Sequence, residues 1–186
     1  MADFLPSTFG NLSPIAGFRK RLFAALFVIA PLLAAPAAQA KQFVRYETGA
    51  EPGTVVIDTA RRRLFFVLGD GRAIEYPVGV PKRGWEWSGS AYVNGKYVRP
   101  DWVPPPEVLE EEPFLPRHVR GGAANNPMGA RAITLDRSEV AIHGSTRRMR
   151  ATIGGAASHG CIRMYNEDVI DLYNRVHVGT PVIMLP

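Results

Sequence analysis

Residues 140–163 read VAIHGSTRRMRATIGGAASHGCIR and concentrate the chemically distinctive residues of this 186-residue chain. The stretch opens with a short apolar run over residues 140–143, which suits a β-strand that delivers His143 at its end. It holds two His-Gly pairs, with fifteen residues between the two histidines. The second pair leads into Cys161, the single cysteine of the chain. A lone cysteine beside a histidine indicates a candidate nucleophile.

The chemistry of such a nucleophile makes specific demands on its neighbours. A cysteine attacks as a thiolate, and a thiol with the ordinary pKa of ~8.5 holds little thiolate at neutral pH. A nearby imidazole can take the thiol proton and return it to a leaving amine, provided that a third group orients the imidazole. Gly160 allows a tight turn before Cys161, and amide N–H groups around these two residues can stabilise an oxyanion.

Two other interpretations of this cysteine stay open from the residues alone. Free cysteine is often a small buried hydrophobe with no chemical role. His143, His159 and Cys161 are also residue types that ligate zinc, and a catalytic zinc site needs only three protein ligands.

The first 40 residues have the pattern of a secretory signal peptide. A basic cluster at residues 19–21 precedes the apolar run LFAALFVIAPLLAAPAA, which ends in the small-x-small cleavage pattern Ala-Gln-Ala. An uncleaved membrane anchor is the alternative, but two prolines interrupt a run that is shorter than the ~20 residues of a spanning helix. We therefore predict cleavage after residue 40, which leaves no stable membrane span.

The mature chain is expected to begin at Lys41, with a short linker over residues 41–51 and one domain over residues 52–186. Exported proteins normally oxidise their cysteines in pairs, so the unpaired Cys161 favours a reactive group. The formal net charge of +5 is too small to indicate a nucleic-acid partner.

Short runs of β-branched and aromatic residues predict a mainly β fold with at least one helix. Residues 64–68 (LFFVL) and 73–80 (AIEYPVGV) flank a Gly-containing turn and predict a β-hairpin. In the second strand of this hairpin, Pro77 indicates an edge position or a bulge. Further strands are expected over residues 54–58, 132–135 and 140–143, and within residues 178–185.

A helix is predicted after the cysteine, over residues 166–176 (NEDVIDLYNRV). Asn166 is the expected N-cap. From Val169 onward, apolar residues recur at i, i+3, i+4 and i+7 and form one apolar face.

Residues 82–127 differ in composition from the rest, because they contain all three tryptophans and seven prolines. This composition disfavours long regular elements, while the tryptophans argue against disorder. We predict a structured Pro/Trp-rich flap beside a cleft. Glu110, Glu111 and Glu112 are expected to form a solvated face of this segment.

The pattern HGS, then SHGC followed by an apolar residue and Arg, resembles the catalytic domain of the L,D-transpeptidases of bacterial cell-wall synthesis. The segments VVIDTARRRLFFV, YPVGVPKRGWEW, PDWVPPPEV and GGAANNPMGARAI are similar to that family in the same order. The resemblance covers residues 52–186. It implies an L,D-transpeptidase-like β-sandwich with a helix after the catalytic cysteine and a flap.

The resemblance also implies the central catalytic roles. Cys161 matches the nucleophile, which attacks the carbonyl at the L-centre of meso-diaminopimelate in a peptidoglycan tetrapeptide stem and releases D-alanine. His143 matches the general base, and the backbone carbonyl of Gly144 is expected to orient it.

Four further motif residues are implied to build the pocket. His159 lines the site, and Ser158 and Gly160 shape the surroundings of the nucleophile. Arg163 is expected to meet a carboxylate of the stem, because its guanidinium is planar and permanently charged.

The acceptor of the acyl group stays open. An amine of a second stem would give a 3→3 cross-link, a lysine of an outer-membrane lipoprotein would give protein anchoring, and water would give an L,D-carboxypeptidase. A cysteine hydrolase on the same fold and a non-catalytic wall-binding protein are the alternative functions. The resemblance implies no cofactor and no metal, and the signal peptide implies a periplasmic enzyme.

Overall fold

The computed structural model describes residues 41–186. The predicted signal peptide, its cleavage point and the alternative anchor lie outside the described residues. Within residues 41–186, no helix is both long enough and apolar enough to cross a membrane.

The fold is mainly β, as predicted, and its centre is a nine-stranded sheet in the order β1-β4-β3-β2-β11-β6-β7-β8-β10. The first five strands of that order are β1 Gln42–Arg45, β4 Arg72–Pro77, β3 Arg63–Gly69, β2 Val55–Asp58 and β11 Pro181–Leu185. The other four are β6 Gly89–Val98, β7 Arg131–Leu135, β8 Ala141–His143 and β10 Ile162–Arg163. A two-stranded sheet joins β5 Val80–Pro81 to β9 Ala156–Ser158. The helices are α1 Pro106–Glu111, α2 Asn166–Arg175 and a 3-10 turn over Met149–Thr152.

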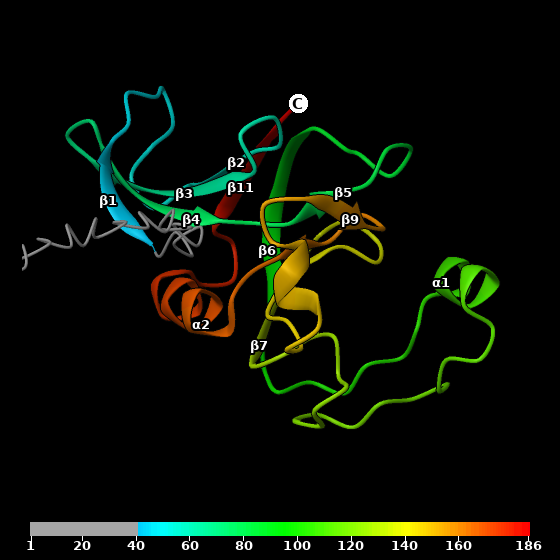
Figure 1. The fold of residues 1–186 in the computed structure, drawn as a ribbon. Coiled ribbons are helices and arrows are strands. Elements are labelled where there is room, and N and C mark those ends of the chain that lie inside the picture. The colour runs from blue at the N-terminus through cyan, green and yellow to red at the C-terminus, as the bar shows by residue number, and fades with distance from the viewer. Residues whose placement is uncertain (1–40) are drawn as a thin grey trace, which may run out of the picture. The chain divides into compact units, whose positions relative to one another are not determined.

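Strand β6 joins the two halves of the sheet. Its first residues pair with β11, and from Val93 onward it pairs with β7, with a register shift between Val93 and Gly95. Buried side chains from both halves, including Ile57 and Ile133, belong to one core cluster, into which α2 inserts Leu172. Figure 1 shows α2 beneath the β1–β4 strands and close to β7.

The predicted hairpin and the predicted helix are confirmed. β3 and β4 pair antiparallel around a tight turn, with Leu64 opposite Tyr76. Along α2, Val169, Leu172 and Val176 are buried, as the apolar spacing indicates. Tyr76 is also fully buried, and its hydroxyl donates a hydrogen bond of 2.5 Å to Asp171 of α2.

The N-terminal segment differs from the expected linker over residues 41–51. Strand β1 pairs antiparallel with β4, and Tyr46 stacks on Phe65 at 4.1 Å between ring centroids. β4 is therefore an interior strand, and the expected edge position of Pro77 is wrong for the strand as a whole. Pro77 is accommodated because the pairing with β1 ends at Glu75.

The segment over residues 82–127 contains an element that the sequence did not reveal. β6 is ten residues long, whereas no long regular element was expected there. Its buried positions are Ala91, Val93 and Gly95, and two of these three are so small that the alternation of apolar residues is weak.

After β6, the chain makes a long excursion away from the sheets, with α1 as its regular element (Figure 1). Its base is held by reciprocal backbone hydrogen bonds of 2.9 and 2.8 Å between Trp102 and Val119. The side-chain amide of Asn126 donates to the carbonyls of Pro100, Val119 and Arg120. The excursion is thus structured, and its function as a flap stays a prediction.

One charged group of α2 is expected to make stability depend on pH. Asp168 is buried, and its Oδ2 has no hydrogen-bond partner among the residues that the structure describes. Burial raises the pKa of Asp168 to about 6, and the negative charges of Glu167 and Asp171 add to this effect. The folded state therefore holds this proton more tightly than the unfolded chain, so stability is lost as the pH rises from about 4 through 6.

We predict that Asp168→Asn raises the Tm at pH 7.5, by about 2–4 °C for each kcal/mol gained. The benefit should disappear at pH 4, where Asp168 is protonated in the folded protein. Thermal unfolding followed by circular dichroism at both pH values measures this. A change in Tm that is the same at pH 4 and pH 7.5 would contradict the assignment.

Candidate active site

The parallel pairing of β8 with β10 brings the two His-Gly motifs together. Ile162 lies opposite Ile142 and Arg163 opposite His143. Both isoleucines are fully buried in the core. Since side chains alternate between the two faces of a strand, His143, Cys161 and Arg163 share the opposite face.

His143 is buried, with 2% of its surface exposed, and its Nδ1 lies 2.8 Å from the carbonyl oxygen of Gly144. A carbonyl can only accept, so Nδ1 carries the proton and Nε2 is the basic nitrogen. Burial lowers the pKa of His143 to about 4, and the charge of Arg163 lowers it further, while the carbonyls of Gly144 and Pro127 oppose this. The imidazole is therefore neutral at neutral pH and free to take a proton at Nε2.

The side chain of Asn166 fixes the backbone that holds His143. Its Oδ1 accepts from the amides of Ala130 at 3.0 Å and Ser145 at 3.1 Å, and its Nδ2 donates to the carbonyl of Ser145 at 2.9 Å. A Cβ at Gly144 would collide with Asn166 Oδ1, so only glycine fits there. The predicted N-cap assignment is wrong: Tyr165 is the N-cap of α2, and Asn166 instead clamps the neighbouring loop.

Cys161 is partly exposed, and its thiol donates a hydrogen bond of 3.4 Å to the carbonyl of Glu139. Burial raises the pKa of the Cys161 thiol, and the Glu139 carboxylate adds to this; the Ala141 amide and Arg163 lower it. Within residues 41–186, no hydrogen bond joins this thiol to His143. The resting state therefore pairs a protonated thiol with a neutral imidazole on the same face.

Ser158 and Gly160 make hydrogen bonds that stabilise the turn leading into Cys161. Ser158 is buried, and its hydroxyl donates to the carbonyl of Cys161 at 2.5 Å. Gly160 has a φ of 113°, which favours glycine, and its carbonyl accepts a hydrogen bond of 3.0 Å from Trp87 Nε1. The structure thus gives both predicted pocket residues a local structural role.

Arg163 is half-buried and packs beside the 3-10 turn. One terminal nitrogen of its guanidinium lies 3.4 Å from Thr152 Oγ1. Its Nε is buried and has no hydrogen-bond partner in residues 41–186. Its charge acts on both Cys161 and His143. Its contact with a substrate carboxylate stays a prediction.

His159 points away from the strand face toward the excursion. Its Nε2 lies 2.9 Å from Glu111 Oε2 of α1 and 2.9 Å from Lys82 Nζ. The ring of Trp85 meets His159 edge-on, with 4.7 Å between centroids. Glu111 is exposed to solvent, as expected for Glu110–Glu112, but it also pairs with Lys82 and His159, which the sequence did not indicate.

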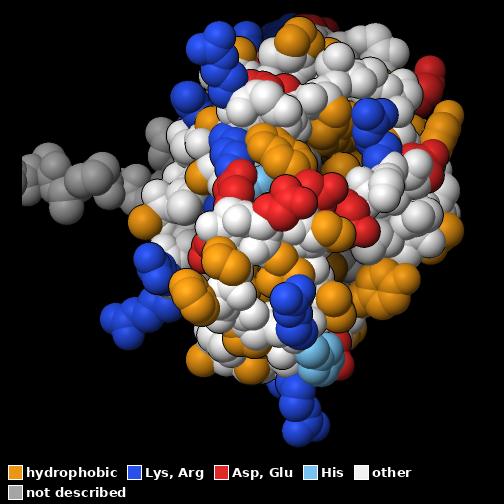
Figure 2. Space-filling view, turned by 90° about the vertical axis from the view of Figure 1, so that its right-hand side faces the viewer, with side chains coloured by type: hydrophobic (Ala, Val, Ile, Leu, Met, Phe, Trp, Pro, Cys, Tyr) orange, Lys and Arg blue, Asp and Glu red, His pale blue; other side chains and the backbone are white. Residues whose placement is uncertain are grey.

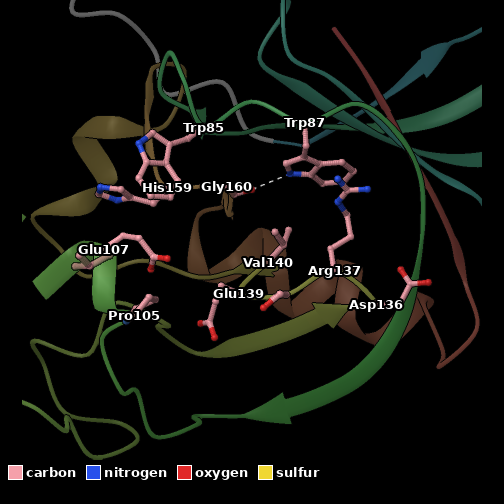
Figure 3. Close-up of a pocket in the computed structure, with 12 residues that line it drawn as sticks. Trp85, Trp87, Pro105, Glu107, Asp136, Arg137, Glu139, Val140, His159 and Gly160 are labelled. Carbon is pink, nitrogen blue, oxygen red and sulfur yellow. Dashed lines mark hydrogen bonds between the residues drawn. The ribbon is translucent and has the colours of Figure 1, made fainter. Parts of the chain in front are cut away.

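Two adjoining pockets lie between the sheet and the excursion. One, of about 560 Å³, is lined by His159, Trp85 and Trp87, and the other, of about 470 Å³, reaches Cys161. Figure 3 shows Trp85 and His159 side by side at one end of the first pocket and Trp87 with Arg137 at the other. Both pockets share a wall of Pro105, Arg137, Ser138, Glu139 and Val140.

Sequence reasoning missed four residues that contact the motif residues: Lys82, Glu111, Glu139 and Asn166. All four lie at least 21 residues from the motif residues that they contact, so no local spacing in the sequence indicates these contacts. Glu139 has a backbone φ of 59°, an unusual conformation that no feature of the sequence predicts. In the part of the chain that the structure describes, no group of three or more His, Cys, Asp and Glu side chains could hold a metal ion.

Comparison with known proteins gives a consistent result. Residues 52–184 match the family model of the L,D-transpeptidase catalytic domain. The probable L,D-transpeptidase ErfK/SrfK of Escherichia coli K12 is 35% identical over 135 residues, which cover 69% of this chain and 42% of that protein. The chain thus spans less than half the length of this curated relative.

Solved structures share the fold. An L,D-transpeptidase from Mycobacterium smegmatis has a TM-score of 0.57 at 18% identity, covering 72% of this chain and 58% of that one. A Brucella melitensis protein, described as a probable carnitine operon oxidoreductase, is 39% identical with a TM-score of 0.53. That alignment covers 80% of this chain and 94% of the other.

We predict that Asn166→Ala lowers the free energy of unfolding by about 1–3 kcal/mol, because two N–H groups and one carbonyl lose their partner. Asn166→Asp keeps both acceptor contacts and should lose less. Urea denaturation of both variants measures the difference. Equal stability of the alanine variant and the wild type would show that the clamp is not needed.

The opposing charges beside Cys161 are expected to set its reactivity. Glu139→Gln should lower the thiol pKa, and Arg163→Gln should raise it. The rate of alkylation by iodoacetamide as a function of pH reports this pKa, since only the thiolate reacts. Glu107→Gln is the matched control, because Glu107 lines the first pocket without acting on the thiol. Shifts of the same sign in the Glu139 and Arg163 variants would refute this account.

Proposed function

The chain belongs to the L,D-transpeptidase catalytic-domain family, and on that premise we propose that Cys161 forms an acyl-enzyme with peptidoglycan stem peptides. The observation that carries this proposal is the pairing of β8, which ends at His143, with β10, which begins directly after Cys161, beside a pocket that Cys161 lines. A neutral imidazole, oriented through Nδ1 by the Gly144 carbonyl, is the arrangement that a cysteine nucleophile needs.

The first step transfers the acyl group to sulfur. The thiol leaves the Glu139 carbonyl and gives its proton to Nε2 of His143 as sulfur attacks the carbonyl at the L-centre of meso-diaminopimelate. The C–N bond to D-alanine then breaks, and the imidazolium returns the proton to the departing amine. Because the thiol pKa is raised and the imidazole pKa is low, the ion pair forms only together with the attack.

The second step releases the thioester to an acceptor. An amine attacks, loses a proton to His143 and restores the thiol. A second stem peptide gives a 3→3 cross-link, and a lysine of an outer-membrane lipoprotein gives protein attachment. Water gives an L,D-carboxypeptidase, which is the second candidate, because the thiol is partly exposed at the cleft.

The remaining site residues support this reaction. Ser158 and Gly160 hold the turn that presents Cys161, so that nearby amides can receive the oxyanion. His159 forms one end of the first pocket. Arg163 stabilises the thiolate by its charge and is the proposed contact for a stem carboxylate. The pattern in residues 1–40 supports export to the periplasm, where peptidoglycan lies.

We expect purified protein to release D-alanine from a diaminopimelate-containing disaccharide tetrapeptide, with a tetrapeptide–tripeptide dimer as the product of transpeptidation. Cys161→Ala should abolish release and keep the fold, and His143→Ala should lose ~10²–10⁴-fold in rate. Mass spectrometry of the products and circular dichroism measure both. Full D-alanine release by either variant would contradict the roles given to Cys161 and His143. Absence of release by the parent protein, together with an unchanged cellular effect of Cys161→Ala, would favour a non-catalytic wall-binding protein.

A further inference from the structure

A compact ionic cluster joins α1 to the SHGC motif. Lys82 Nζ lies 2.7 Å from both carboxylate oxygens of Glu111, and His159 Nε2 lies 2.9 Å from Glu111 Oε2. The ring of Trp85 flanks the cluster, since Lys82 Nζ is 5.9 Å from its centroid and His159 meets it edge-on. The hydrogen bonds from Lys82 and His159 lower the pKa of Glu111, which is therefore ionised.

The groups that surround Glu111 are a recognition site for a carboxylate in general. The ammonium of Lys82 donates to both oxygens of the planar anion. His159 Nε2, which lies 2.9 Å from Glu111 Oε2 and 2.9 Å from Lys82 Nζ, adds a second donor when Nε2 carries a proton. Nothing in these contacts depends on the aliphatic part of the glutamate. The cluster borders the first pocket through His159 and Trp85, which line it, so a carboxylate that replaced Glu111 at this border would meet the same donors.

The glutamate that occupies the site is weakly held. α1 buries none of its side chains, so the helix gains little from packing. The side chains of Lys82 and Glu111 are 33% and 47% exposed, and ion pairs this accessible to solvent contribute little net stability. Figure 2 shows acidic side chains gathered in a band across this face. Four glutamates belong to α1 and its C-cap residue: Glu107, Glu110, Glu111 and Glu112.

The position of the cluster connects it to the reaction. His159 lies two residues before Cys161, and it lines the first pocket together with Gly160. That pocket adjoins the one that reaches the thiol. The diaminopimelate–D-alanine end of a stem tetrapeptide carries two free carboxylates, one at the terminal D-alanine and one at the D-centre of diaminopimelate.

We propose that Lys82 and His159 form a carboxylate-binding subsite for the donor stem peptide, and that Glu111 occupies this subsite in the absence of substrate. This inference rests on the proposed function. Glu111 then acts as an internal competitor: the substrate carboxylate replaces it, and α1 is released from the body of the protein as the donor binds. Lys82 becomes a specificity residue, since a neutral group would not displace the glutamate.

The test measures the binding of stem peptides to the Cys161→Ala protein, in which no turnover occurs, by isothermal titration calorimetry. Three tetrapeptides are compared: one with both carboxylates free, one amidated at the terminal D-alanine, and one amidated at the D-centre of diaminopimelate. Glu111→Gln and Lys82→Met are introduced separately. Glu110→Gln is the matched control, because Glu110 is the exposed neighbour of Glu111 on α1 and lines neither pocket.

We expect Glu111→Gln to tighten the binding of the free peptide by about two- to fivefold, as removal of a partly exposed ion pair allows. Lys82→Met should weaken it by a similar factor. One of the two amidated peptides should bind more weakly to the parent protein and should not respond to Lys82→Met, which identifies the carboxylate that the subsite takes. Glu110→Gln should change nothing.

Two results would overturn the inference and separate it from the proposed function. If Lys82→Met weakens all three peptides equally, or if Glu111→Gln weakens the free peptide, stem peptides bind but the subsite takes neither carboxylate of the diaminopimelate–D-alanine end. If none of the three peptides binds the Cys161→Ala protein, the proposed function fails and takes this inference with it.

Discussion

One amide side chain, that of Asn166, holds the backbone of the candidate active site in place. Its three hydrogen bonds tie the start of α2 to the backbone of Ala130 and Ser145, on either side of the glycine whose carbonyl orients His143. The tautomer of the imidazole therefore depends on a residue that never faces the cleft. Gly144 is part of the same constraint, because only a residue without a Cβ leaves room for the amide.

The sequence predicted the elements whose residues carry a strong local pattern. The hairpin of β3 and β4 and the apolar face of α2 follow from alternation and from helical spacing, and the motif residues around Cys161 follow from the resemblance. β6 was not predicted because most of its buried residues are small, and β1 was not predicted because it is short and largely exposed. Neither the pairing of β6 with two different neighbours nor the burial of Gly95 can be read from a local window.

The candidate site also combines residues that the sequence predicted with residues that it did not. His143, Gly144 and Cys161 belong to recognisable sequence motifs, whereas the residues that contact them come from distant segments. Asn166 reaches across 36 residues to Ala130, and Lys82 across 77 residues to His159. Such contacts arise from the fold and have no spacing of their own. The charges of Arg163 and Glu139 act on the thiol in opposite directions, and only the folded arrangement brings both to Cys161.

The place of β11 in the sheet limits how early the core of the molecule can assemble. β11 is parallel to β2 on one side and antiparallel to β6 on the other, so it fills a slot between elements that precede it by more than 80 residues. During synthesis, β2 and β6 each keep an open edge until residues 181–185 leave the ribosome, and open edges invite pairing with other chains. The core is therefore complete only once β11 has been inserted between β2 and β6.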